Sequence, residues 1–168
     1  APKSKLQVAG GIQMADDTDT ASADKVGTMR YRTDTEYVEV DGEELVTNGN
    51  FATDSDWNKN TGWAISGGTA NGVSATSITQ TVSISVNKTY EVTYTISNYV
   101  SGIFRVILGG YAAGTNRTAN GTYTDIITVT NASSNSLLYL TGDLSAFTGS
   151  IDNVSVIEVT EEDASYAD

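Results

Sequence analysis

The sequence predicts an all-β protein, namely a two-sheet β-sandwich preceded by a short leader that contains a β-hairpin. Two observations carry this prediction. Apolar and polar residues alternate over several short segments, and Gly or Asn residues typical of turns stand between these segments. No segment keeps the 3.6-residue apolar period of a helix over a useful length. Short alternating strands of this kind indicate two sheets packed face to face.

The leader, residues 1–44, is charged and irregular. It carries ten acidic and five basic residues in a chain of net charge −12. Residues 28–33 and 36–40 alternate on either side of Asp34-Thr35, which predicts a β-hairpin, and Asp41-Gly42 predicts a further turn. A segment of this size has little core of its own. We therefore expect it to pack on the body or on copies of itself.

The body, residues 45–160, holds the strands of the predicted sandwich. Residues 78–86 and 90–96 alternate strictly, and residues 103–108 are apolar apart from Arg105. Alternation from 151 to 159 places Ile151 and Val154 on opposite faces. The last eight residues, 161–168, carry four acids and no base, which predicts an acidic solvated tail. In chain order, the candidate strands are residues 45–47, 63–66, 69–70, 78–86, 90–96, 103–108, 123–130, 137–140 and 151–159.

The composition excludes several function classes. The chain has no Cys and no His, which removes thiolate metal sites, cysteine nucleophiles and a Ser-His-Asp triad. A pI near 4.1 argues against nucleic acid as a partner. No stretch approaches the roughly 18 apolar residues of a membrane span, so we expect no membrane insertion. The body acids Glu91 and Asp125 have no glycosidase motif around them, and we expect no enzyme.

Both ends of the body carry a recognisable pattern. The opening reads Glu-Leu-Val-Thr-Asn-Gly-Asn-Phe over residues 44–51, followed by Trp57 and Gly62-Trp63, and the closing reads Ser-Ile-Asp-Asn-Val-Ser-Val over residues 150–156. These segments resemble the first and last strands of jelly-roll carbohydrate-binding modules of the galactose-binding-like superfamily. The resemblance implies a jelly-roll fold and non-catalytic binding of glycans.

The leader resembles a second family. Residues 26–35, Val-Gly-Thr-Met-Arg-Tyr-Arg-Thr-Asp-Thr, and residues 5–11, Lys-Leu-Gln-Val-Ala-Gly-Gly, are similar to segments of bacteriophage tail fibres and other virion surface proteins. In that family such segments commonly lie in trimeric fibres or spikes. The resemblance implies a homotrimer at the virion surface, attached to other virion proteins through residues 1–44, with host-surface glycan as its partner.

A glycan site needs flat aromatic faces and planar hydrogen-bonding groups. Trp57 lies in a polar loop, Tyr99 and Tyr111 lie near strand ends, and Arg105 interrupts an apolar strand. We expect these four residues to line one site, with Arg117 as a weaker candidate. Alternatively, these residues pack in the core or face solvent. For Trp63 and Tyr139 we expect packing in the core.

The carbohydrate-binding family often holds a structural Ca²⁺ between its opening and closing strands. Asp152 matches the family's ligand position in the closing strand, and Asn50 is a second candidate ligand. The family's opening acid is Ala52 here, although Asp54 or Asp56 stands nearby as a substitute. Calcium prefers several oxygen ligands. Alternatively, Asp152 hydrogen-bonds its own backbone at a turn.

Three functions remain open at this point. The first is a phage fibre, spike or head fibre whose sandwich binds host glycans. The second is a capsid decoration protein whose sandwich is a spacer without a ligand. The third is a carbohydrate-binding module of a bacterial glycoside hydrolase, which leaves the leader unexplained. A glycan site requires exposed aromatic residues that converge on one face, whereas a spacer buries or scatters Trp57, Tyr99 and Tyr111.

Overall fold

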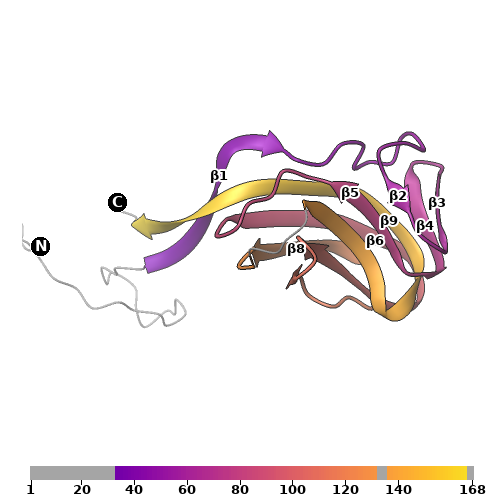
Figure 1. Cartoon of the computed structure of the whole chain (residues 1–168). Coiled ribbons are helices and arrows are strands. Elements are labelled where there is room, and N and C mark those ends of the chain that lie inside the picture. The colour runs from indigo at the N-terminus through magenta and orange to yellow at the C-terminus, as the bar shows by residue number, and fades with distance from the viewer. Residues whose placement is uncertain (1–32, 132–135, 166–168) are drawn as a thin grey trace, which may run out of the picture. The chain divides into compact units, whose positions relative to one another are not determined.

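The computed structural model describes residues 33–131 and 136–165. Residues 38–160 form one compact unit, and residues 1–37 and 161–168 are grouped as a second unit. The prediction of an all-β sandwich is confirmed, because the described residues form nine strands and no helix (Figure 1). The fibre-like segments 5–11 and 26–32 lie outside the described residues. No helix in the described part is long and apolar enough to cross a bilayer.

The strands share one hydrogen-bonded sheet that folds over on itself. In chain order they are β1 (Thr33–Glu44), β2 (Asn58–Lys59), β3 (Trp63–Ser66), β4 (Thr69–Ala75), β5 (Ser77–Thr81), β6 (Thr89–Leu108), β7 (Ala112–Ala113), β8 (Gly121–Thr128) and β9 (Leu137–Ser165).

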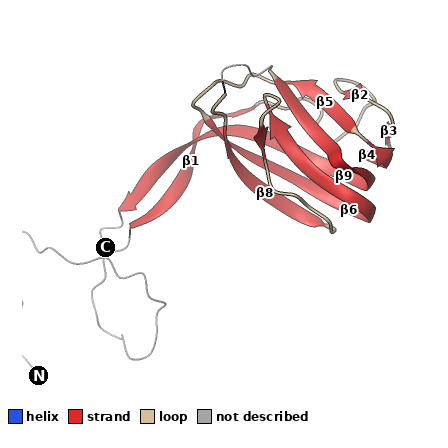
Figure 2. Cartoon of the chain, turned by 60° about the horizontal axis from the view of Figure 1, so that its bottom comes forward, coloured by secondary structure: helices blue, strands red, loops and turns tan. Residues whose placement is uncertain are grey.

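A long antiparallel ladder between β6 and β9 organises the sandwich. It runs from the pair Thr89–Val159 to the pair Leu108–Leu138, with register shifts between Ser97 and Arg105. The ladder bends at these shifts, and its two halves become the centres of two layers (Figure 2). The first layer adds β8 and β4 to the ladder, and the second adds β7, β5 and β2.

The core lies between the two layers. Alternate residues of each strand point inward, as the period of two predicts. Rings from the two halves of β6 meet there, with 5.2 Å between the ring centroids of Tyr94 and Phe104. The fully buried side chains of β6 and β9 include Tyr90, Val92, Tyr94, Phe104, Val106, Leu108, Leu138, Leu140, Ile151 and Val156.

Glycines make the bend possible. The ring of Phe147 is buried at the bend, and a Cβ added to Gly149 would lie 2.6 Å from its Cζ. A Cβ on Gly142 would lie 2.6 Å from the Phe147 nitrogen. Gly102 has a φ of +90°, and its added Cβ would lie 2.1 Å from the Ala146 carbonyl oxygen. At Gly102 the strands β6 and β9 therefore approach each other more closely than a side chain would allow, while Gly142 and Gly149 leave room for Phe147 of their own strand.

Several predicted boundaries are wrong. Strand β1 runs without a break across Asp34-Thr35 and Asp41-Gly42 and pairs with β9, whereas residues 28–32 of the predicted hairpin lie outside the described residues. The runs 90–96 and 103–108 are one strand, as are 137–140 and 151–159, because bulges bend the ladder without ending it. Strand β9 also continues to Ser165, into the predicted tail.

The face assignment in the closing strand also changes. Alternation places Ile151 and Val154 on opposite faces, yet both are buried. Asn153 has a φ of +50°, in the left-handed region. The ladder shifts register between Thr93 and Thr95, opposite this residue. The extra residue of the bulge reverses the alternation, so Val154 and Val156 join the core.

Candidate functional site

Trp57 is a core residue. It is 6% exposed, its ring centroid lies 5.1 Å from that of Phe51, and its Nε1 donates to the Asn48 carbonyl oxygen at 3.1 Å. The loop folds back because the Asn48 Nδ2 donates to the carbonyl oxygens of Thr53 and Ser55. The expectation that Trp57 offers a face for stacking on a sugar is therefore wrong. Phe51 and Trp57, at the two ends of a polar loop, form a buried apolar pair.

Tyr99 and Tyr111 lie at different places in the sandwich. Tyr99 is half-buried at the bend, where its hydroxyl donates to the Gly102 carbonyl oxygen at 2.8 Å. Tyr111 is 64% exposed and follows the opposite end of β6, with its nitrogen donating to the Leu108 carbonyl oxygen at 3.3 Å. At about 3.3 Å per residue, up to roughly 30 Å of strand separates the two tyrosines. They do not share a binding face.

Arg105 is held by an acid on the neighbouring strand. Its Nε donates to the Asp143 Oδ1 at 3.0 Å, and its Nη2 donates to the Oδ2 of the same carboxylate. This two-point hydrogen bond lowers the pKa of Asp143 and raises the pKa of Arg105. The guanidinium that we expected to clamp a sugar is therefore already engaged.

Arg117 connects the two layers. Its backbone exchanges two hydrogen bonds with Phe104 in the second layer, at 2.7 and 3.0 Å. Its side chain reaches Asp125 in the first layer, with 2.6 Å between Nη2 and Oδ1. The Arg117 Nε also donates to the Tyr94 hydroxyl at 3.2 Å, and that hydroxyl donates to Asp125 at 2.9 Å. We call Arg117, Asp125, Tyr94 and the stacked ring of Tyr123 the Arg117 cluster.

The Arg117 cluster is a structural feature of the core. The side chain of Asp125 is 4% exposed and that of Arg117 is 21% exposed. Burial raises the pKa of Tyr94, and the charge of Asp125 raises it further. The alternation of β8 carries the sequence signal that we missed, because Asp125 stands on the same inward face as Ile127. An acid at an inward position requires a buried partner.

The residues present do not fit a calcium ion. The Asn50 Oδ1 accepts from the Ala52 nitrogen at 3.2 Å, and the Asp152 Oδ1 accepts from the Asn153 nitrogen at 2.7 Å. Asp54 pairs with Lys59. Within the described residues no three Asp, Glu, His or Cys side chains gather. Calcium takes about six to eight oxygen ligands, and these side chains instead bind backbone or side-chain groups close to them in the sequence.

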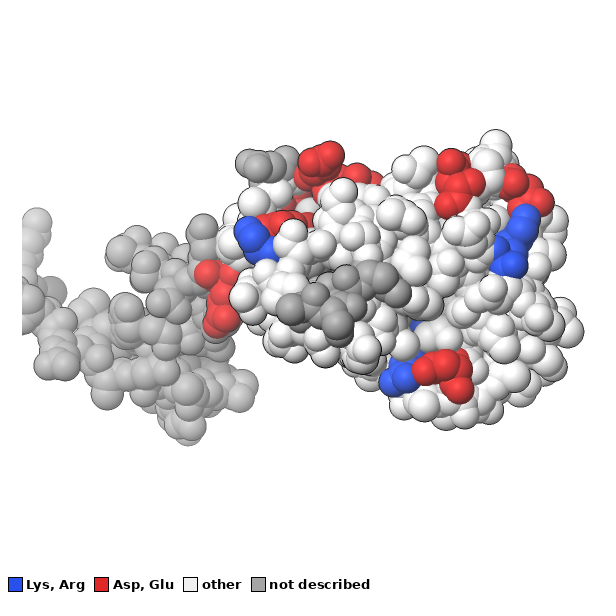
Figure 3. All heavy atoms as spheres, viewed as in Figure 1, with Lys and Arg blue, Asp and Glu red and all other residues white. Residues whose placement is uncertain are grey.

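All four basic residues of the body are paired with acids. Besides the two arginines, Lys59 pairs with Asp54 and Lys88 pairs with Glu158. Figure 3 shows that charged side chains form a few separate patches on an otherwise uncharged face. An anionic glycan would therefore find no unpaired cation on the body, contrary to the expectation for Arg105 and Arg117.

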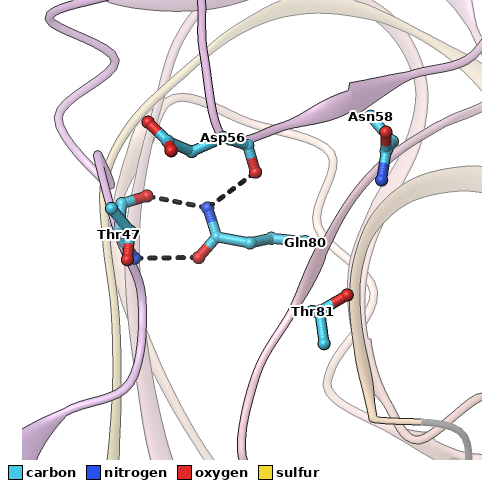
Figure 4. A pocket seen from close by; sticks show the side chains of 5 residues that line it. All are labelled: Thr47, Asp56, Asn58, Gln80 and Thr81. Atoms are coloured by element: carbon cyan, nitrogen blue, oxygen red, sulfur yellow. Dashed lines mark hydrogen bonds between the residues drawn. The ribbon is translucent and has the colours of Figure 1, made fainter.

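A polar hollow lies beside β2 and β5. It has a volume of about 210 Å³ and is lined by Thr47, Asp56, Asn58, Gln80 and Thr81 (Figure 4). The buried Gln80 amide exchanges two hydrogen bonds with the Thr47 backbone and donates a third to the Asp56 carbonyl oxygen.

The open hydrogen-bonding groups of the hollow are few. Figure 4 shows the Asn58 carboxamide and the Thr81 hydroxyl on the side of Gln80 away from Thr47, while the Asp56 carboxylate points away from Asn58. The hollow thus offers hydrogen bonds to a small polar group and no aromatic face. Sequence analysis missed it, because Asn58 and Thr81 carry no motif.

Comparisons with known proteins do not assign the chain to a family. No protein-family model matches the chain, and no curated protein matches it.

Proposed function

We propose that this chain is a bacteriophage virion surface protein in which the β-sandwich is a rigid displayed module without a dedicated ligand. The leader, residues 1–44, attaches the protein to other virion proteins and brings three copies together. The resemblance of residues 5–11 and 26–35 to fibre segments supports the location. The fate of the predicted binding residues supports the absence of a ligand.

The burial or pairing of the predicted binding residues is the observation that carries the proposal. A glycan site needs converging aromatic faces and free planar donors. Trp57 is buried and Tyr99 supports the bend, while Arg105 and Arg117 are each paired with a carboxylate. Only Tyr111 among the five candidates is strongly exposed. The side chains that favoured binding stabilise the sandwich instead.

The position of the chain ends within residues 38–160 suits display. The nitrogen of Leu45 donates to the Val156 carbonyl oxygen at 3.0 Å, so the chain enters this unit beside the strand on which it leaves. The bend lies in the middle of the β6–β9 ladder, at the far end of the half that starts from the pair Thr89–Val159. Exposed apolar residues near the bend are Val73, Val100 and Leu144. A module held at one end presents its bend outward.

Weak glycan binding at the polar hollow is the second candidate function. The open groups of Asn58 and Thr81 favour it, because a carboxamide and a hydroxyl suit the hydroxyls of an uncharged sugar. Without an aromatic face, a single site would bind weakly. Many copies on one particle would convert such contacts into avidity.

Two measurements test these proposals on the full chain. Light scattering is expected to give the mass of three chains, and a monomer would contradict the role given to residues 1–44. A glycan array is expected to show no specific signal for the unmodified chain. A signal lost in the double variant Asn58→Ala, Thr81→Ala but kept in the control Tyr111→Ala would replace the first function with the second.

A further inference from the structure

Three Asn-Gly dipeptides occur in the chain, at residues 48–49, 71–72 and 120–121. In such a dipeptide the glycine nitrogen can attack the asparagine side-chain carbon, because glycine has no Cβ to obstruct the approach. Folding suppresses this reaction where both groups are held in place, so the rate depends on local opening. The three sites should therefore differ according to the contacts of each asparagine.

Two of the three sites are held tightly. The Asn48 Nδ2 donates to two carbonyl oxygens, and its Oδ1 accepts from the Thr53 nitrogen. Gly49 is wedged against the closing strand, where an added Cβ would lie 1.9 Å from the Val154 carbonyl oxygen. Attack at Asn48 would need this turn to leave the sandwich.

Asn71 is held in the middle of the sheet. Its Oδ1 accepts from the Ser150 hydroxyl at 2.8 Å, and its Nδ2 lies within hydrogen-bond distance of the Ser66 and Thr69 carbonyl oxygens. Gly72 is buried and pairs with residues on both sides, Trp63 in β3 and Gly149 in β9. Strand pairing holds the backbone of Gly72, and these hydrogen bonds hold the Asn71 side chain.

Asn120 differs from both. It is exposed, and Gly121 is the first residue of the edge strand β8. In the described part of the chain its Nδ2 has no hydrogen-bond partner, while its Oδ1 accepts from the Tyr99 nitrogen at 2.8 Å. A donor on the amide oxygen stabilises the negative charge that develops there during attack, as in an oxyanion hole. The leaving nitrogen is free to depart into solvent.

We propose that Asn120-Gly121 is a site of spontaneous deamidation. The Gly121 nitrogen forms a bond to the Asn120 Cγ and gives up its proton, and the Cγ–Nδ2 bond breaks to release ammonia. Water then opens the resulting succinimide at either carbonyl, which yields aspartate or isoaspartate at position 120. No oxidant or enzyme takes part, and the chain gains one negative charge.

The product alters the contact between β8 and the bend. Isoaspartate adds a methylene group to the backbone just before β8, where the Asn120 carbonyl oxygen accepts from the Tyr123 hydroxyl and the side chain holds the Tyr99 nitrogen. We expect the β8 end next to residue 120 to open more often in the isoaspartate form. Slow deamidation of the protein would then destabilise this one strand end.

The test follows all three dipeptides in one sample. The full chain is incubated in mildly alkaline buffer at physiological temperature and digested at intervals, and mass spectrometry measures the exchange of ammonia for water in each peptide. Asn120 is expected to convert at least about ten-fold faster than Asn48 or Asn71. This ratio corresponds to an opening free energy that is about 1.4 kcal/mol higher at Asn48 and Asn71 than at Asn120. In urea, the three peptides are expected to convert at similar rates.

Two results would overturn the proposal. One is conversion of Asn48 or Asn71 in the folded chain at the rate of Asn120. The other is an unchanged rate in Gly121→Ala with no isoaspartate formed, which would mean direct hydrolysis without cyclisation. A thermal melt of Gly121→Ala serves as the folding control, because the added Cβ lies 3.1 Å from the Tyr123 ring.

Discussion

Replacing Asp125 by Ala tests the Arg117 cluster as a structural feature. The variant removes the carboxylate that accepts from Arg117 and from the Tyr94 hydroxyl. Breaking a buried ion pair by removing one partner costs about 3–5 kcal/mol. Because the Arg117 side chain remains 21% exposed, water can partly solvate it, and we expect the lower end of this range, about 3 kcal/mol.

Urea unfolding followed by the fluorescence of the buried Trp57 and Trp63 measures this loss. With a slope of about 1–3 kcal/mol per molar urea, a loss of 3 kcal/mol lowers the unfolding midpoint by about 1–3 M. A double-mutant cycle with Arg117→Ala isolates the interaction between the two side chains and is expected to give about 1–3 kcal/mol.

The exposed pair Arg105–Asp143 is the matched control. The Asp143 side chain is 39% exposed, whereas that of Asp125 is 4% exposed, so we expect Asp143→Ala to cost no more than about 1 kcal/mol. If Asp125→Ala costs as little as the control, or if the cycle shows no coupling, the reasoning that the cluster joins the two layers is refuted.

Three further predictions concern the bend and its surroundings. Phe147→Ala is expected to destabilise the sandwich by about 3–5 kcal/mol in the same urea assay, because the ring is fully buried, and Phe147→Leu is expected to cost less. Gly102→Ala is expected to lower the melting temperature, since φ is +90° and the added methyl overlaps the Ala146 carbonyl; an unchanged melting temperature would contradict the tight approach at the bend. The pKa of Asp143 lies below its ordinary 3.8, so the stability that Arg105 adds is present above that pH and is lost as pH falls through the lowered pKa. Asp143→Asn should therefore have a lower free energy of unfolding than the unmodified chain near neutral pH, and the difference should disappear in acid. A difference independent of pH would contradict this reasoning.

The alternating segments predicted the core strands well. Tyr90, Val92, Tyr94 and Ile96 are buried as the period of two requires, because side-chain direction in a strand depends only on the neighbouring residues. The bends could not be predicted in this way. Glycines at 102, 142 and 149 resemble strand ends in the sequence, but long-range pairing continues through them.

The candidate site was predicted poorly, because binding and packing use the same residue types. Trp57 in a polar loop and Arg105 in an apolar strand each fit a ligand site or a structural partner. Their partners, Phe51 with the Asn48 carbonyl and Asp143, are brought to them by loop closure and by strand pairing. Nothing at positions 57 or 105 themselves encodes that choice.

The sequence by itself determined the all-β class, the division into a charged leader and a nearly neutral body, and the inward face of the regular strands. These follow from composition and from contacts between near neighbours along the chain. Only the tertiary structure decided that β6 and β9 bend as single strands, that Asn153 reverses the alternation of the closing strand, and that Arg117 meets Asp125 across the layers. Each of these depends on the register between distant segments, and a one-residue shift in register changes which side chains meet.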